Sequence, residues 1–308
     1  MTTNSKVLFI TGSSGFVGQR LANKANFLGF KVVGVDIKVD PNNKWESHEV
    51  NILENDFSYL IPKDAIVIHL ASLSTDSACR NNPQLAVNVN YLGTLNTINC
   101  ANKARAGHFI FASSEWVYPE KTEIIEQFES DILNLEDLQS LYAITKLVGE
   151  SLVRTESKIP YTNLRFGIVY GPRETPGSSI EVLALKVHNN EEITVGSNLT
   201  ARRFIFIDDL VDGILKCAIL ETEEIPNNAL NLTGDELISL GEVVNCTGEL
   251  LGKQTNILTE LKIPSIRNPV NDYGKSLLKW DPITTLSIGI QLCLVEMTKN
   301  NTNKYEIK

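Results

Sequence analysis

Tyr142 and Lys146 are the residues whose types and spacing point most directly to chemistry. They stand four apart in the helical pattern of residues 141–156, and therefore on one helix face. A lysine ammonium beside a phenol stabilises the phenolate, so we expect the pKa of Tyr142 to fall from about 10 towards the working pH. The phenolate would then be a general base able to take a proton from an alcohol.

Two serines favour this interpretation. Ser113 and Ser114 end the apolar run 109–112, which is typical of a buried strand. A hydroxyl at a strand end would face the crevice where ligands bind and share the hydrogen bond of the alcohol. A Ser-Ser pair at a strand end is also a common turn former. In combination with Tyr142, we predict a catalytic role for Ser114.

Three glycines form a second pattern. Gly12, Gly15 and Gly18 separate the apolar run 7–10 from a helical pattern that starts at Phe16. A helix opened in this way leaves unpaired N–H groups where its dipole favours negative charge. The first glycine permits a tight turn, the second lets a pyrophosphate approach, and the third lets the helix pack closely on the sheet. An ordinary strand–turn–helix junction is the plainer alternative.

Asp36 completes the pattern of a dinucleotide site. It ends the apolar run 32–35, 18 residues after Gly18. A carboxylate there accepts hydrogen bonds from both ribose hydroxyls of an adenosine and repels a 2′-phosphate. A solvated strand-end carboxylate is the alternative. Lys38 leaves NADP open, but no arginine directly follows Asp36, so the sequence favours NAD.

Strands and helices alternate through the first two-thirds of the chain, which predicts an α/β fold with a doubly wound parallel sheet covered on both faces. The predicted strands are residues 7–10, 32–35, 65–70, 109–112 and 162–166, and the predicted helices are 16–28, 87–104 and 141–156. After Gly171, prolines and glycines punctuate shorter elements. We therefore expect a dinucleotide-binding domain over 1–165 and a mainly substrate-binding region over 166–308, with 203–220 returning to the first domain.

The composition bounds the function. The chain has 308 residues, 43% of them hydrophobic, and a net charge of −9, which argues against nucleic acid or an anionic membrane as a partner. Residues 1–6 lead straight into the first strand, so we expect no signal peptide. The five cysteines have no metal-ligand spacing, which predicts no metal and fits a reducing cytoplasm. An acidic protein that binds anionic ligands must supply positive charge locally, which makes single arginines informative.

At this point a family resemblance is evident. The motifs are TGSSGFVG (11–18), HLAS (69–72), NYLGT (90–94), ASSEWVY (112–118), YAITK (142–146) with Gly149-Glu150, LRFGIVYGP (164–172), RRFIFIDD (202–209), and DYGK (272–275) with WDP (280–282). Almost end to end, the chain resembles the extended short-chain dehydrogenase/reductases of the NAD-dependent epimerase/dehydratase family, which act on nucleotide sugars. The resemblance implies a seven-stranded Rossmann-like sheet, a smaller C-terminal substrate-binding domain, and a homodimer formed by the helices at 87–104 and 141–156.

The resemblance also implies roles for particular residues. Catalysis falls to Ser114, Tyr142 and Lys146. NAD is expected to contact Gly12, Ser14, Gly15, Phe16, Val17, Gly18, Asp36, Ile37, Asn51, Ile52, Leu70, Ala71, Ser72 and Asn90, together with Tyr142 and Lys146. The nucleotide-sugar substrate is expected to contact Ser74, Ser114, Glu115, Arg202 and Arg267, with Arg202 at the diphosphate.

Departures from the family pattern narrow the reaction. Glu115 and Trp116 stand where 4,6-dehydratases place an acid–base Asp-Glu pair, and a tryptophan cannot protonate a leaving hydroxyl. Ile168 replaces a substrate-contacting asparagine. The resulting hypothesis is a nucleotide-sugar epimerase that acts at C4 through a transient 4-keto intermediate. A 4-keto-sugar reductase using NAD(P)H, a dehydratase or decarboxylase, and a non-catalytic dinucleotide sensor remain as alternatives.

Overall fold

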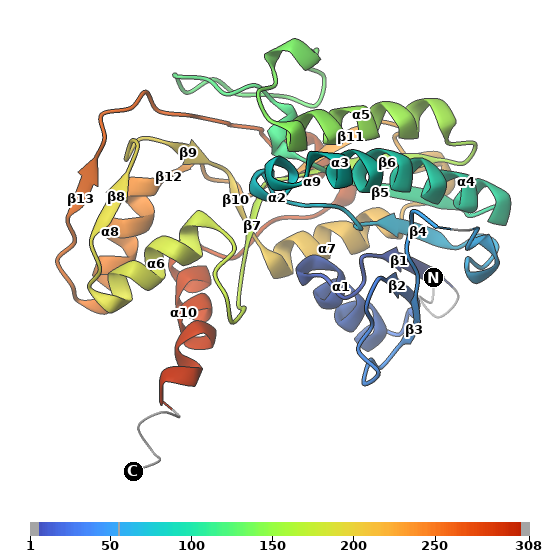
Figure 1. Cartoon of the computed structure of the whole chain (residues 1–308), viewed down its shortest axis with the longest axis horizontal. Helices are drawn as coiled ribbons and strands as arrows, with labels where there is room; N and C mark the ends of the chain where they lie inside the picture. The colour runs from blue at the N-terminus through green and yellow to red at the C-terminus, as the bar shows by residue number, and fades with distance from the viewer. Residues whose placement is uncertain (1–5, 55, 303–308) are drawn as a thin grey trace.

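The computed structural model describes residues 6–54 and 56–302 (Figure 1). Residues 1–5, on which the expected lack of a signal peptide partly rests, lie outside this range. A seven-stranded sheet has the order β11-β6-β5-β4-β1-β2-β3, and every neighbouring pair is parallel. Its strands are β1 (Val7–Thr11), β2 (Lys31–Asp36), β3 (Glu46–Glu49), β4 (Ile66–His69), β5 (His108–Ser114), β6 (Tyr161–Phe166) and β11 (Ala229–Leu232). The chain therefore has the predicted Rossmann-like sheet.

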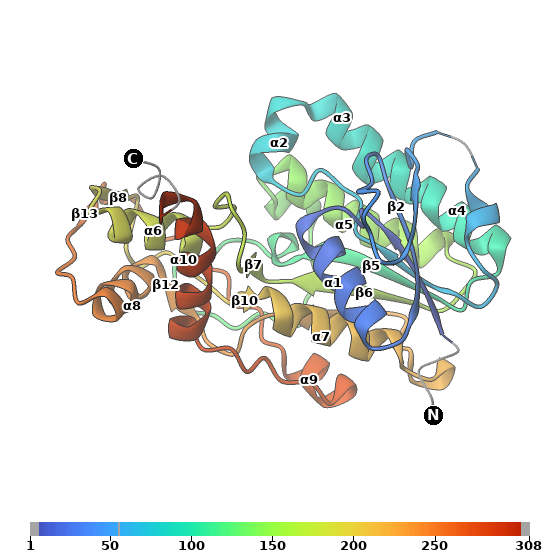
Figure 2. The same ribbon diagram turned by 90° about the horizontal axis from the view of Figure 1, so that it is seen from below.

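Apolar residues form the central strands because both faces of the sheet are covered. In β1, Leu8 and Ile10 join one core cluster, whereas Phe9 joins another on the opposite face. Helices α4 (Thr94–Ala104) and α5 (Leu141–Glu156) cover the face of Phe9, and helices α1 (Phe16–Phe27) and α7 (Ile207–Ala218) cover the other (Figure 2). Because all neighbouring strands are parallel, their carboxyl ends lie at one edge of the sheet, between the helices on its two faces.

The predicted helix at 87–104 is not continuous. Helix α3 (Pro83–Val87) starts earlier, and a π-helical segment, η3 (Asn88–Gly93), separates it from α4. The short helix α2 (Asp76–Asn81) and the 3-10 turns η2 (Ser58–Leu60), η4 (Glu115–Val117), η5 (Leu135–Asp137) and η6 (Thr222–Glu224) complete this part of the fold.

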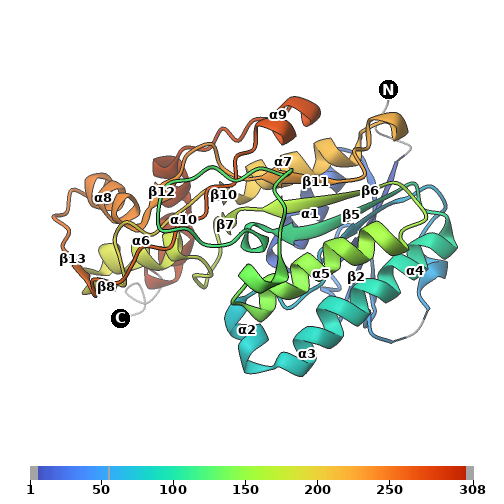
Figure 3. The same cartoon turned by 90° about the horizontal axis from the view of Figure 1, so that it is seen from above.

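A smaller lobe lies at the carboxyl edge of the large sheet (Figure 3). It contains α6 (Ser179–Asn189), α8 (Leu240–Leu251) and α10 (Leu286–Thr302), with β8 (Ile193–Val195) paired to β13 (Ile257–Thr259) and β9 (Ala201–Arg202) paired to β12 (Ile238–Ser239). Strand β7 (Ile168–Tyr170) pairs with β10 (Phe204–Phe206) where the two lobes meet. Helix α9 (Asp272–Leu278) lies near β11.

The sequence predicts that residues 203–220 return to the first domain. Within them, residues 204–206 form β10, which pairs only with β7 in the described chain and does not join the seven-stranded sheet. Helix α7 does pack beside α1, where Arg20 pairs with Asp208 at 2.5 Å and Lys24 pairs with Asp212 at 2.6 Å. The strand that re-enters the sheet is β11, beyond the expected return at 203–220. In the described part of the chain no helix has both the length and the apolar character to cross a membrane.

Candidate active site

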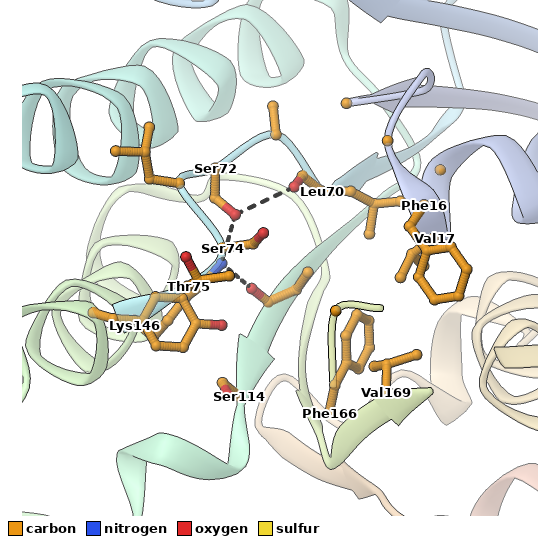
Figure 4. A pocket seen from close by; sticks show the side chains of 18 of the residues that line it. Phe16, Val17, Leu70, Ser72, Ser74, Thr75, Ser114, Lys146, Phe166 and Val169 are labelled. Carbon is orange, nitrogen blue, oxygen red and sulfur yellow. Dashed lines mark hydrogen bonds between the residues drawn. The ribbon is translucent and has the colours of Figure 1, made fainter. Parts of the chain in front are cut away.

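A cavity of about 1080 Å³ lies along the carboxyl ends of the strands, between the two lobes (Figure 4). This volume is at the upper end of the roughly 300–1,000 Å³ of pockets for drug-sized molecules, which suits a large ligand. The lining includes most of the predicted site residues: Gly12, Ser14, Gly15, Phe16, Val17, Gly18, Asp36, Ile37, Asn51, Ile52, Leu70, Ala71, Ser72, Ser74, Ser114, Tyr142, Lys146 and Arg202. Three predicted site residues, Asn90, Glu115 and Arg267, lie outside the lining.

The glycine turn has a shape that only glycine permits at two positions. Gly12 has φ +72°, and a Cβ there would lie 2.7 Å from the backbone nitrogen of Ala71. A Cβ on Gly18 would lie 2.1 Å from the carbonyl oxygen of Gly12. Gly15 is the N-cap of α1, whose first N–H groups have no partner within the helix. The start of α1 is therefore a cradle of backbone donors that suits a pyrophosphate.

Asp36 is held next to this cradle. The backbone N–H of Ser14 donates to its Oδ2 at 3.0 Å, and the Ser14 hydroxyl donates to the carbonyl oxygen of Lys38 at 2.7 Å. The carboxylate is thereby fixed at the end of β2, on the wall of the cavity. This position suits the ribose of a dinucleotide bound with its pyrophosphate on the turn.

Lys146 and Tyr142 extend from α5 into the opposite end of the cavity. The lysine Nζ donates to the carbonyl oxygen of Ala112 at 2.8 Å and to Ser72 Oγ at 3.3 Å (Figure 4). Burial lowers the pKa of Lys146 to about 8. Its Nζ lies 5.8 Å from the centroid of the Tyr142 ring.

The expected lowering of the tyrosine pKa is wrong for the protein without ligands. Burial raises the pKa of Tyr142 to about 12, and the Ser114 hydroxyl offsets only part of that increase. The ammonium of Lys146 bonds elsewhere, so desolvation of the phenolate outweighs its attraction. Positive charge close to the phenol would lower its pKa again.

The geometry separates the two adjacent serines. Ser113 Oγ donates to Glu150 Oε1 at 2.5 Å, and Glu150 forms a buried ion pair with Arg165 at 2.8 Å. Ser114 instead lines the cavity beside Tyr142, and its Oγ accepts the backbone N–H of Trp116 at 3.3 Å. Ser114 is thus the serine placed for chemistry, and Ser113 is occupied in the core.

Asn90 lies behind the cavity wall, contrary to the predicted contact with the cofactor. Its Oδ1 accepts the Leu73 N–H at 2.8 Å, and its Nδ2 donates to the Leu73 carbonyl at 3.1 Å and to Thr145 Oγ1 at 3.0 Å. It is 2% exposed. Asn90 therefore ties the loop after β4 to α5 and positions residues that line the cavity.

Arg202 reaches the cavity with most of its donors engaged. Nη1 donates to the carbonyl oxygens of Ala201 at 2.8 Å and Ser265 at 2.6 Å, and Nη2 donates to Ser265 Oγ at 2.7 Å. Nη2 also contacts the exposed carboxylate of Glu120 at 3.3 Å. An anionic ligand reaching Arg202 would compete with Glu120, which is the weakest of these contacts.

Glu115 and Arg267, which were predicted to contact the substrate, lie behind the same wall and outside the cavity lining. Glu115 is fully buried, with Oε1 3.3 Å from Arg202 Nε. That distance is within ion-pair range, but among the described residues neither carboxylate oxygen has a hydrogen-bond partner. Burial raises the pKa of Glu115 to about 7 against the opposing effect of the two arginines. Arg267 pairs with Glu120 at 3.0 Å and donates from Nε to the Tyr118 carbonyl at 3.0 Å.

Sequence reasoning missed some residues of the lining. Phe166 and Val169 form an apolar wall across from Lys146 (Figure 4). The guanidinium of Arg173 lies 4.1 Å from the centroid of the Phe16 ring and pairs with Glu181 at 2.7 Å. The available signal for Arg173 was its position directly after the motif at 164–172.

The sheet order and the glycine turn define a Rossmann-like α/β protein of the dinucleotide-binding class. Residues 8–232 match the NAD dependent epimerase/dehydratase family, and the chain belongs to that family. YtcB of Bacillus subtilis (strain 168), described as an uncharacterized UDP-glucose epimerase, is 27% identical over 92% of this chain and 95% of its own length.

Two further similarities are informative. UDP-glucuronic acid decarboxylase 1 of Xenopus tropicalis is 27% identical over 92% of this chain and 70% of its own length. The solved structure of MoeE5 in complex with UDP-glucuronic acid and NAD has a TM-score of 0.81 at 24% identity, covering 96% of this chain and 100% of that chain. At this identity the structural similarity establishes the fold alone.

Proposed function

We propose that this protein is an NAD-dependent nucleotide-sugar epimerase acting at C4 of the sugar through a transient 4-keto intermediate. The observation that carries the proposal is the shared cavity. Ser114, Tyr142 and Lys146 line one end of it, and the glycine turn with Asp36 lines the other. Both halves of such a reaction, cofactor binding and proton transfer, therefore have residues in one space.

The cavity fits the cofactor on the features described above: the donor cradle at Gly12–Gly18 and the carboxylate of Asp36. Bound NAD would supply the hydride acceptor and donor for C4. In this proposal Lys146, already bonded to Ser72, holds the ribose next to the reacting end.

Proton transfer falls to Tyr142. As a phenolate it takes the proton of the C4 hydroxyl, and it returns the same proton when the keto group is reduced, so no net proton or electron is consumed. Ser114 holds the alcohol and then the keto oxygen by a hydrogen bond. Because burial raises the pKa of Tyr142 to about 12, ionisation depends on positive charge entering the cavity, and oxidised nicotinamide carries such a charge.

Arg202 is the proposed contact for the substrate diphosphate, because it is a partly buried arginine that reaches the lining. The UDP-sugars in the names of the relatives make UDP-glucose and UDP-glucuronic acid the first substrates to test.

A decarboxylase of UDP-glucuronic acid is the second candidate, since one relative carries that name. Oxidation at C4 is common to both reactions, but a decarboxylase releases carbon dioxide from the keto acid. Trp116 places an indole, which has no carboxyl group, where dehydratases have an acid. This substitution disfavours water elimination and says less about decarboxylation, so product analysis must decide.

The proposal includes a homodimer formed through η3, α4 and α5. It is supported by Leu85, Val87 and Leu92, whose large apolar side chains are at least 39% exposed near these helices.

The proposed compartment is the cytoplasm, which agrees with five free cysteines, four of them buried.

The test uses the purified full-length chain. Mass spectrometry should detect co-purifying NAD, and each UDP-sugar should yield its C4 epimer without net cofactor consumption. Tyr142→Phe should lower kcat by roughly 10²- to 10⁴-fold with bound NAD retained. Stoichiometric NADH consumption would instead identify a reductase, and release of carbon dioxide would identify a decarboxylase. Absence of turnover together with absence of bound nicotinamide would overturn the proposal.

A further inference from the structure

Trp116 contacts both residues to which the proposed chemistry assigns the C4 hydroxyl. Its backbone N–H donates to Ser114 Oγ at 3.3 Å. Its ring packs edge-to-face against the ring of Tyr142, with centroids 5.9 Å apart and an interplanar angle of 77°. Trp116 also lines the cavity. One residue thus links the serine and the tyrosine.

Each contact has a defined physical effect. By accepting a backbone N–H, the Ser114 oxygen leaves its own proton free to be donated to a substrate oxygen. The edge-to-face contact limits tilting of the Tyr142 ring, and such aromatic pairs contribute about 0.5–1.5 kcal/mol beyond their buried area. The other members of the apolar cluster around Tyr142 are Cys79, Ala86, Leu73 and Leu141, and all are smaller than the indole.

Arg267 holds the other side of this arrangement. Its guanidinium carbon lies 4.6 Å from the centroid of the Trp116 ring, which is cation–π geometry. The guanidinium is anchored by the Tyr118 carbonyl and by Glu120, at 3.0 Å each. Arg267 is 5% exposed and lies outside the cavity lining. It is therefore placed to clamp the indole rather than to face a ligand.

We infer that Trp116 is a positioning residue for Ser114 and Tyr142, and that Arg267 acts through Trp116 rather than by contacting the substrate. This inference rests on the proposed role of Tyr142. A rival role exists for Arg267, because its Nη1 has no hydrogen-bond partner in the described chain and a substrate phosphate could supply one. The two roles predict different kinetic changes.

The first experiment alters Trp116. Trp116→Ala should lower kcat by about 10- to 100-fold, because a displaced proton acceptor reduces the fraction of reactive geometries, while KM should change by less than about threefold. Trp116→Phe keeps an aromatic edge and should retain kcat within about threefold. If Trp116→Ala does not fold, Trp116→Leu keeps the apolar volume without the aromatic ring. Wild-type kcat in the alanine or leucine variant would overturn the inference, as would a loss confined to KM.

The second experiment is a double-mutant cycle with Arg267→Met, which keeps part of the apolar stem of the side chain and removes its charge. Alone it should lower kcat by about three- to tenfold, and in the Trp116→Ala background it should have no further effect, because coupled residues are non-additive. Arg202→Met is the matched comparison and should raise KM and weaken UDP binding. If Arg267→Met raises KM in the same way and equally in both backgrounds, Arg267 is a substrate ligand and the inference fails.

Calorimetric titration with UDP distinguishes a failure of the proposed function from a failure of the inferred role of Arg267. If the wild-type protein epimerises none of the sugars, the proposed function fails, and UDP affinity still decides the role of Arg267. An unchanged Kd in Arg267→Met supports the clamp. A Kd weakened as much as in Arg202→Met overturns it.

Discussion

Glu115 is a fully buried carboxyl group between two arginines, and this environment makes it sensitive to pH. Its oxygens lie close to Arg202 but receive no hydrogen bond from the described residues. A buried carboxylate without hydrogen bonds is costly, and the neutral acid is correspondingly favoured. The protonation of Glu115 is therefore expected to make the stability of the protein depend on pH.

This burial predicts the direction of a stability change. The pKa of Glu115 is raised from 4.5 to about 7, so in that interval the folded state keeps a proton that the unfolded chain has lost. The contribution of Glu115 to the stability of the folded state is fully present below the pKa of the unfolded chain. It is lost as the pH rises through about 7. Glu115→Gln should remove this loss, at most about 3 kcal/mol, leaving the variant relatively more stable above neutral pH.

Urea denaturation of both proteins across this pH range measures the difference. A free-energy difference between wild type and Glu115→Gln that does not vary with pH would contradict the assignment.

Asp36 should decide which dinucleotide is preferred. Asp36→Ala removes an acceptor for ribose hydroxyls and the partner of the Ser14 N–H, so NADH should bind about tenfold more weakly. NADPH should bind relatively better, because the negative charge that repels a 2′-phosphate is gone. Fluorescence titration with both reduced cofactors tests this, with Asp40→Ala as the nearby control. An equal loss of affinity for the two cofactors would point to a collapsed turn instead.

At the scale of elements, α1 can approach the sheet only because Gly18 has no side chain. Gly18→Ala places a Cβ 2.1 Å from the Gly12 carbonyl oxygen, which should cost about 1–3 kcal/mol and weaken NAD binding about tenfold. Gly196→Ala is the control, since its Cβ would meet the flexible Lys262 side chain at 3.2 Å. Thermal unfolding and the amount of co-purifying nicotinamide are the measurements. Wild-type nicotinamide content in Gly18→Ala would show that the turn tolerates a side chain.

Elements with strong local signals were predicted well. Helix α5 has the expected bounds because Ser140 caps its start and an amphipathic pattern runs through it. The discontinuity at η3 was missed, since apolar spacing cannot distinguish a π-helical turn from an α-helix. Strand β11 was missed because it is four residues long and includes Asn231, whose side chain bonds to Tyr118 and Val270.

The residues of the candidate site also divide into those whose positions local geometry predicts and those that it does not. Residues on the glycine turn and on α5 were predicted because local geometry fixes their direction. Glu115, directly beyond the end of β5, and Arg267, on a loop, were expected at the substrate but lie outside the cavity lining. Their directions depend on tertiary partners, Arg202 for the first and Trp116 and Glu120 for the second. Motif position alone does not contain that information.

At the scale of the whole molecule, the proposed dimer can be tested separately from catalysis. Leu92→Glu places a charge on an apolar side chain that is 47% exposed in η3. If η3, α4 and α5 form the interface, this variant should sediment as a monomer, because an unpaired charge in an interface core is costly. Ile263→Glu, at an exposed apolar position outside these helices, should leave the assembly unchanged. A Leu92→Glu variant with the wild-type sedimentation coefficient would contradict this interface.

The late entry of β11 into the large sheet has a consequence for how the protein can be divided. Between β6 and β11 the chain leaves the sheet, builds part of the smaller lobe and returns, and afterwards it leaves again. Neither lobe is a contiguous stretch of sequence. A fragment ending after β6 would leave the edge of that strand without its partner and prone to pairing with other chains. No single cut in the coding sequence can therefore separate the two lobes. Exchanging the substrate lobe between relatives requires grafting several segments at once.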